Sequence, residues 1–137
     1  GVNIAMLTWA CERGASLNGD LLELYCGNGN FTLPLACHFD HVIATELSKT
    51  SVRAARENLA ENGIDNVQII RLSAEEVSAA IRGDREFRRL AELPRPLADY
   101  DLRTIFVDPP RAGLDAQTLK MACDFPEVLY ISCNPQT

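Results

Sequence analysis

The chain has 137 residues, 47% of them hydrophobic, and its 13 basic and 19 acidic residues give a formal net charge of −6. This length corresponds to one domain, and the apolar fraction excludes a disordered chain. The sequence contains no run of about 18 uncharged apolar residues, which a membrane-spanning helix would need. The acidic balance excludes a strongly basic module that holds nucleic acid by bulk charge alone, but not an enzyme that acts on nucleic acid.

Short apolar runs of 5 to 7 residues alternate with segments whose apolar residues recur at helical spacing. Nearly continuous apolar runs are typical of strands that are covered on both faces. The predicted strands are 21–26, 41–46, 67–71, 103–108 and 127–133. The predicted helices are 3–13, 31–38, 48–62, 73–83 and 115–123, and segment 84–101 predicts a short polar helix and an irregular connection. This alternation predicts an α/β fold with a parallel sheet and right-handed crossovers.

A Gly-x-Gly turn, Gly27 to Gly29, follows the first predicted strand, where such a turn lets the backbone approach a ligand closely. The dinucleotide fingerprint needs a third glycine where this chain has Thr32, which disfavours a pyrophosphate site. Glu46 ends the second predicted strand, 19 residues after Gly27, where a carboxylate can accept both ribose hydroxyls of a nucleoside. The turn and the acid favour a nucleoside cofactor without phosphates, such as S-adenosylmethionine. The alternatives are a plain tight turn with a helix-capping acid, and an NAD-binding domain.

Two reactive side chains end the last two predicted strands. Asp108 precedes Pro109 and Pro110, which fix the backbone and project the acid from the end of its strand, where open parallel sheets bind ligands. Cys133 ends the next strand, about 4.8 Å away, so the thiol is predicted to lie beside Asp108 and face the cofactor turn as a candidate nucleophile. Arg111 stands where methyltransferases that act on the amino group of a base carry an aromatic residue. The arginine therefore counts against methylation of an amino group.

The other cysteines are interpreted as packing residues, because free cysteines are usually buried; they are Cys11, Cys26, Cys37 and Cys123. An odd number of scattered cysteines without a Cys-x-x-Cys pair argues against a disulfide framework and against a metal site. Free thiols without a signal segment predict a cytoplasmic location.

Because the chain begins with Gly1 and ends at Thr137, shortly after an apolar run, we interpret residues 1–137 as a fragment that forms one catalytic domain.

Four motifs occur in a specific order: LELYCGNGNF at 22–31, ATE at 44–46, FVDPPRAGLD at 106–115 and YISCNP at 130–135. Together they resemble the RNA uracil-5-methyltransferase family, and within it the bacterial tRNA branch that acts on the T-loop. The resemblance implies a Rossmann-like S-adenosylmethionine-dependent methyltransferase fold with strand order 3-2-1-4-5, truncated before the last two strands. It also implies methylation of carbon 5 of a tRNA uridine through a covalent cysteine–uracil intermediate. The alternative within the family is the same chemistry on ribosomal RNA.

The resemblance also implies a role for each matching residue. Tyr25, Gly27, Asn30, Glu46 and Asp108 are expected at the cofactor, Asp108 and Arg111 at the target base, and Cys133 as nucleophile. The family's general-base glutamate is expected beyond Thr137, so the chain alone is expected to be inactive. We also expect self-association through the exposed edge of the fifth strand.

Arginines between residues 82 and 95 offer contacts to RNA phosphates. Because Asp84, Glu86 and Glu92 alternate with them, a solvated helix face is the favoured interpretation of this segment.

Overall fold

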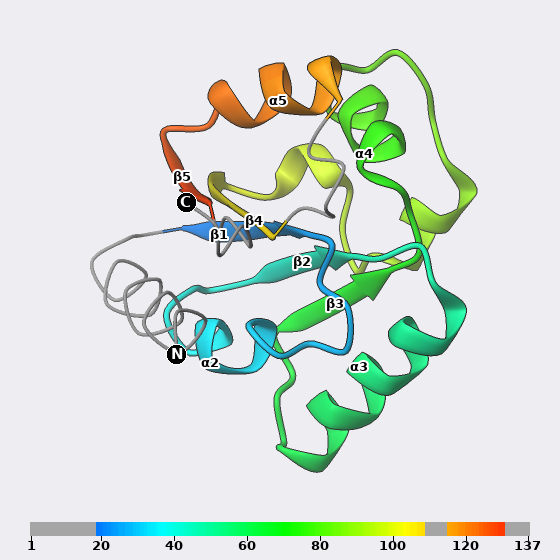
Figure 1. The fold of residues 1–137 in the computed structure, drawn as a ribbon, viewed down its shortest axis with the longest axis vertical. Helices are drawn as coiled ribbons and strands as arrows, with labels where there is room; N and C mark the ends of the chain where they lie inside the picture. Colours follow the sequence, from blue (N-terminus) through cyan, green and yellow to red (C-terminus); the bar gives the residue numbers. More distant parts are fainter. Residues whose placement is uncertain (1–18, 109–114, 131–137) are drawn as a thin grey trace, which may run out of the picture.

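Five parallel strands form the central sheet of the computed structural model, which describes residues 19–108 and 115–130 (Figure 1). The strands are β1 (Asp20–Leu24), β2 (Val42–Thr45), β3 (Val67–Ile70), β4 (Leu102–Val107) and β5 (Glu127–Tyr130). Their order is β3-β2-β1-β4-β5, and each neighbouring pair is parallel, which confirms the predicted sheet.

Helices cover both faces of this sheet. The helices are α2 (Thr32–Ala36), α3 (Lys49–Glu61), α4 (Ala74–Ile81) and α5 (Ala116–Cys123), with 3-10 helices η1 (Arg88–Glu92) and η2 (Leu97–Asp99). In Figure 1, α2 and α3 lie on one side of the sheet, and α4 and α5 lie on the other. The predicted helix at 3–13 lies outside the described residues. No helix within the described ranges is both long and apolar enough to cross a membrane.

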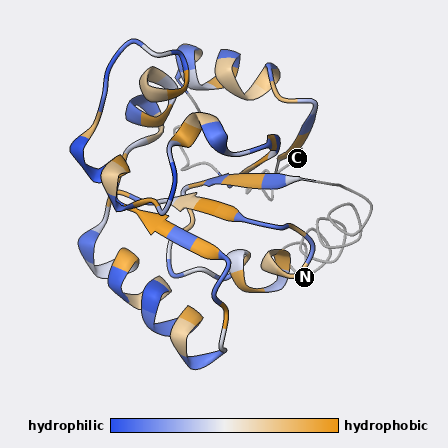
Figure 2. Ribbon diagram, turned by 180° about the vertical axis from the view of Figure 1, so that it is seen from behind, coloured by the Kyte–Doolittle hydropathy of each residue, from blue (hydrophilic) through white to orange (hydrophobic). Residues whose placement is uncertain are grey.

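Most strand residues are hydrophobic, as the orange colour of the strands in Figure 2 shows, and they are buried because each face of the sheet packs against a helical layer. Along β1, Leu21 packs with the α3 residue Val52 in one core cluster, and Leu22 packs with the α4 residue Val77 in the other. Successive side chains of a strand point to opposite faces, so a strand buried on both sides needs an apolar residue at nearly every position. β1 also holds two buried acids, Asp20 at its first position and Glu23, which is 1% exposed.

Side-chain caps fix where three of the helices begin. The Ser48 hydroxyl accepts the Ser51 amide proton and starts α3, so Ser48 rather than Thr50 is the cap. A complete capping box starts α4: the Ser73 hydroxyl accepts from the Glu76 amide, and the Glu76 carboxylate accepts from the Ser73 amide. The Asp115 carboxylate caps α5.

Two predicted elements differ from the structure. β1 ends at Leu24 rather than at Cys26, because Tyr25 adopts a left-handed backbone conformation that ends the extended chain. Segment 84–101 holds the two 3-10 helices η1 and η2 instead of one polar helix. Pro94 explains the interruption, because proline lacks an amide hydrogen and disfavours helical conformation in the residue before it.

Candidate functional site

The carboxyl ends of the parallel strands bring several predicted site residues to one edge of the sheet. Tyr25 follows β1, Glu46 follows β2 and Asp108 follows β4. The strand register aligns these ends. Leu24 of β1 pairs with Val107 of β4, and the Cys26 amide after β1 donates to the Thr45 carbonyl of β2 at 3.1 Å. Tyr25, Glu46 and Asp108 thus lie at one edge of the sheet, and their role at a cofactor stays a prediction.

The turn between β1 and α2 depends on three left-handed residues. Tyr25 and Gly27 each have a φ of +56°, and Gly29 has a φ of +90°. For a bulky residue this conformation is an outlier of the kind that clusters at ligand sites. A Cβ atom on Gly27 would meet no atom within 4 Å, so the turn faces open space at that point. The Asn58 side chain of α3 donates to the Asn28 carbonyl at 2.9 Å and holds the turn from the other side.

Glu46 joins this turn to the end of β2. Its Oε1 accepts the Gly27 amide at 3.0 Å, and its Oε2 accepts the amides of Leu47 and Ser48 at 2.9 and 3.0 Å. A carboxylate offers roughly four acceptor positions, so one position on Oε1 remains for a ligand hydroxyl. The bonds to Leu47 and Ser48 match the helix-capping alternative, and the bond to Gly27 ties the same carboxylate to the glycine turn.

Sequence reasoning missed a buried pair beneath the turn. Thr32, noted only for the missing glycine, donates its hydroxyl proton to Glu23 Oε1 at 2.5 Å. Burial of Glu23 raises its pKa to about 7, the Thr32 hydrogen bond opposes this rise, and the nearby Asp108 charge adds to it. The sequence feature that could have revealed this pair is the single acid, Glu23, inside an apolar predicted strand. A buried acid needs a hydrogen-bond partner, so its presence indicates one nearby. The pair fixes the first residue of α2 onto β1 and so positions the turn between them.

Acidic side chains lie near this edge of the sheet. Asp108 is half-buried at the end of β4. Burial raises the pKa of Tyr25, and the charges of Glu75 and Asp115 add to this effect. The first turn of α4 and the cap of α5 therefore lie near the turn. Several carboxylates near one edge of the sheet favour a ligand that carries positive charge.

The remaining predicted site residues have different outcomes. Asn30 is exposed at the end of the turn, and Arg111 and Cys133 lie outside the described residues. β5 ends at Tyr130, which pairs with Val107, so the two strands that lead to Asp108 and Cys133 are neighbours as predicted.

Three other cysteines lie in the described part of the chain. Cys26 is buried in the turn rather than within β1. Burial raises the pKa of its thiol, as do the charges of Glu23 and Glu46. Cys37 and Cys123 are exposed, so the prediction that they are packing residues is wrong. Each stands at the end of a helix, where helical spacing no longer decides burial. Within residues 19–108 and 115–130, no cluster of three or more His, Cys, Asp or Glu side chains is arranged to hold a metal ion.

The family model of tRNA (Uracil-5-)-methyltransferase matches residues 1–137, the whole chain. The chain belongs to the tRNA (uracil-5-)-methyltransferase family. It is 61% identical over 132 residues to a tRNA/tmRNA (uracil-C(5))-methyltransferase of Acinetobacter baylyi, covering 96% of this chain and 37% of that protein. A relative of the same name from Aromatoleum aromaticum is 59% identical over 137 residues, covering 100% of this chain and 37% of the relative. The chain thus spans a little over a third of the length of these relatives.

Solved structures support the fold of this family member. The precorrin 8w decarboxylase of Methanobacterium thermoautotrophicum matches with a TM-score of 0.68 at 19% identity, covering 97% of this chain and 64% of that one. A SAM-dependent methyltransferase from Agrobacterium tumefaciens matches with a TM-score of 0.59 at 19% identity, covering 79% and 31%. These likenesses confirm the Rossmann-like methyltransferase fold.

Proposed function

We propose that the protein transfers a methyl group from S-adenosylmethionine to carbon 5 of a uridine in the T-loop of tRNA. The match of the whole chain to the family model carries this proposal. It is supported by relatives at about 60% identity that are named tRNA/tmRNA (uracil-C(5))-methyltransferases. A neighbour of the same fold from Streptococcus mutans was solved in complex with SAH.

The carboxyl edge of the sheet has the features that such a cofactor needs. The turn offers open space at Gly27, and Glu46 retains an acceptor position for a ribose hydroxyl. Tyr25, Asn30 and Asp108 border the same edge and are assigned to cofactor contacts. When bound, S-adenosylmethionine supplies a methyl group on a positively charged sulfur, and the surrounding carboxylates suit this charge.

Cys133 is assigned as the nucleophile. Its thiolate adds to carbon 6 of the uracil ring, forming a sulfur–carbon bond and placing electron density on carbon 5, which is otherwise a poor nucleophile. After methylation a base removes the carbon-5 proton, the carbon 5–carbon 6 double bond forms again, and the thiolate leaves. Asp108 and Arg111 are assigned to holding the base in place. The target uridine must leave its stack to reach the thiol, at a cost of a few kcal/mol.

The proposal assigns the general base to a glutamate outside these 137 residues. A polypeptide limited to residues 1–137 is therefore expected to give no turnover on tRNA, and to self-associate through the outer edge of β5. In the cell, we place the reaction in the cytoplasm.

The test is a methylation assay with the protein at its natural length. With S-adenosylmethionine and unmodified tRNA, we expect 5-methyluridine at one T-loop position, detected by nucleoside mass spectrometry. Methylation of ribosomal RNA but not of tRNA would overturn the substrate, and absence of 5-methyluridine from both would overturn the activity.

Cofactor binding is tested separately by calorimetric titration. Glu46→Gln is expected to weaken S-adenosylmethionine binding about tenfold or more, because a charge-assisted hydrogen bond is lost. Glu57→Gln removes an exposed carboxylate of α3 and is the matched control. Binding of NAD in place of S-adenosylmethionine would refute the cofactor assignment.

A further inference from the structure

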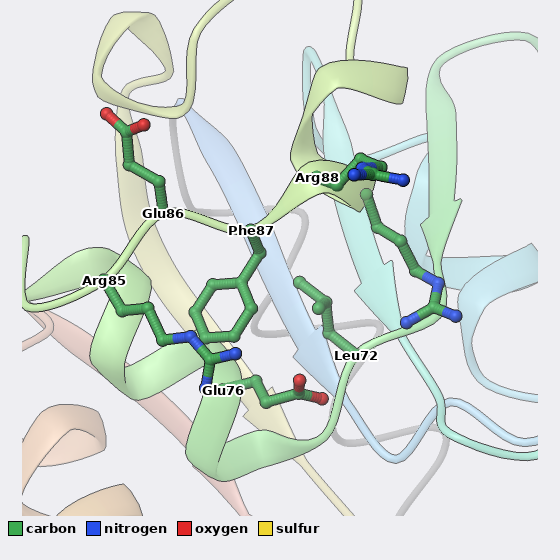
Figure 3. A pocket seen from close by; sticks show the side chains of 7 residues that line it. Leu72, Glu76, Arg85, Glu86, Phe87 and Arg88 are labelled. Carbon is green, nitrogen blue, oxygen red and sulfur yellow. The ribbon is translucent and has the colours of Figure 1, made fainter.

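A concave region lies beside the carboxyl end of β3. It is a cavity of about 320 Å³ lined by Leu72, Phe87 and three arginines, Arg85, Arg88 and Arg89. Phe87 is partly buried against the core cluster that contains Leu72, so it anchors the short segment that carries the arginines. Figure 3 shows Arg85 and Arg88 on opposite sides of Phe87. We call this region the arginine pocket.

Two acidic residues, Glu76 and Glu86, also line the pocket, so three positive and two negative side chains surround it. Glu76 Oε1 accepts the Ser73 amide at 2.9 Å as part of the capping box. The carboxylate of Glu86 points away from Phe87 and Arg85 in Figure 3. The charged side chains of this segment are exposed, as the solvated interpretation expected, but residues 84–87 precede the 3-10 helix η1 and the segment is not one continuous helix face.

The three guanidinium groups have no carboxylate partner among the described residues. Arg85 instead lies over the Phe87 ring, with 4.7 Å from its guanidinium carbon to the ring centroid. Elsewhere in the described chain, Arg56, Arg82 and Arg103 each pair with a carboxylate at 2.9 to 3.3 Å. Arg53, Arg71 and Arg95 also lack a carboxylate partner in the described chain, so what distinguishes Arg85, Arg88 and Arg89 is that the three lie within five residues and line one cavity.

The arginine pocket adjoins the candidate active site through the first turn of α4. Glu76 lines the pocket, and the charge of the preceding residue, Glu75, acts on Tyr25 of the glycine turn. β3 is three strand spacings from β4, roughly 14 Å. A uridine bound over the end of β4 therefore leaves neighbouring nucleotides within reach of the pocket.

We propose that the arginine pocket binds backbone phosphates of the RNA substrate, an inference that rests on the proposed function. Guanidinium groups present a planar set of donors that matches phosphate oxygens, and they are more weakly hydrated than ammonium groups. Phosphate contacts fix register and orientation without reading the base sequence. The pocket thus positions the tRNA while Asp108, Arg111 and Cys133 act on the uridine.

The test compares two charge-matched double variants of the protein at its natural length. The first is Arg88→Gln with Arg89→Gln. The control is Arg53→Gln with Lys120→Gln, which removes two exposed charges from α3 and α5. Binding of tRNA is measured by fluorescence anisotropy over a series of sodium chloride concentrations, and binding of S-adenosylmethionine is measured in parallel.

The pocket variant is expected to bind tRNA about tenfold more weakly and to lower the slope of log Kd against log salt by roughly 1.5. Its affinity for S-adenosylmethionine and its rate at saturating tRNA are expected to stay within about twofold of the unmodified protein, because the pocket contacts neither reacting group. The control is expected to keep the full slope.

An unchanged salt slope in the pocket variant would overturn this inference, whereas absence of tRNA methylation by the unmodified protein would overturn the proposed function. An equal loss of slope in both double variants would show bulk charge rather than a site and would also refute the pocket. Should the double variant unfold, Arg88→Gln and Arg89→Gln are tested singly, each with about half of the effect expected. Single variants with the full slope would then refute it.

Discussion

Replacing Glu23 with glutamine is expected to stabilise the domain at neutral pH. Glu23 is 1% exposed, and its carboxylate accepts a hydrogen bond from Thr32. Burial raises its pKa from 4.5 to about 7, because the cost of burying the charge exceeds what the Thr32 bond returns, and Asp108 adds to the rise. Glutamine keeps the shape of the protonated acid and removes the charge.

The magnitude follows from proton linkage. Between pH 4.5 and about 7 the folded protein holds a proton on Glu23 that the unfolded chain has already released. The stability that this group contributes is therefore complete below pH 4.5, falls as pH rises, and is lost above about pH 7. The difference between the two pKa values corresponds to about 3 kcal/mol. Glu23→Gln removes this dependence of stability on pH. The free energy of unfolding of the variant, relative to that of the unmodified protein, therefore rises by up to about 3 kcal/mol between acidic and neutral pH.

Hydrogen exchange of the β1 and β4 amides measures this effect in the protein at its natural length. Exchange from core strands reports the free energy of unfolding, so protection in Glu23→Gln relative to the unmodified protein is expected to increase on the order of a hundredfold from about pH 5 to about pH 8. At about pH 5, the protection of Glu23→Gln relative to the unmodified protein measures how well the glutamine side chain packs in place of the protonated acid. Glu57→Gln, at an exposed position, is the control. A ratio that is the same at both pH values would refute the reasoning.

Three further predictions concern the turn and the elements beside it. Gly29→Ala is expected to lower the free energy of unfolding by about 1–2 kcal/mol in urea titration, because alanine is strained at a φ of +90°; an unchanged midpoint would contradict this. Cys37 is expected to react with iodoacetamide in the native protein, whereas Cys26 is protected until denaturant is added, because Cys26 is buried and its pKa is raised; peptide mapping that shows equal rates would contradict this. Ser73→Ala is expected to cost about 1 kcal/mol by removing the α4 capping box, and Ser73→Asp to recover most of it; equal stability of both variants would count against the cap.

The strands and the helix starts could be predicted from the sequence because their signals are local, whereas the order of the strands in the sheet came from the family resemblance. Continuous apolar runs identify strands that are buried on both faces, and Ser73 with Glu76 specifies a capping box by spacing alone. The position of Glu46 at the end of β2 follows from the same pattern. These features depend on short-range chemistry that a single sequence carries.

Other features depend on contacts that no spacing encodes. The Glu23–Thr32 bond requires knowing that the two buried side chains meet between β1 and α2. The end of β1 depends on the left-handed conformation of Tyr25. The arginine pocket arises because Phe87 turns into the core and separates Arg85 from Arg88. Alternating charges in the sequence suggested a uniform solvated surface there. The charged side chains are exposed, and the packing of Phe87 against the core groups three arginines around one cavity.

The most direct test of the account is to trap the covalent intermediate on Cys133. In 5-fluorouridine the fluorine takes the place of the proton that must leave carbon 5, so the sulfur–carbon bond cannot be released. With T-loop RNA containing 5-fluorouridine and S-adenosylmethionine, we expect peptide mass spectrometry of the natural-length protein to find a methylated nucleotide adduct on Cys133. Cys133→Ser is expected to give no adduct and Cys37→Ser a normal one. An adduct on another residue, or 5-methyluridine formation by Cys133→Ser at the normal rate, would contradict the central claim.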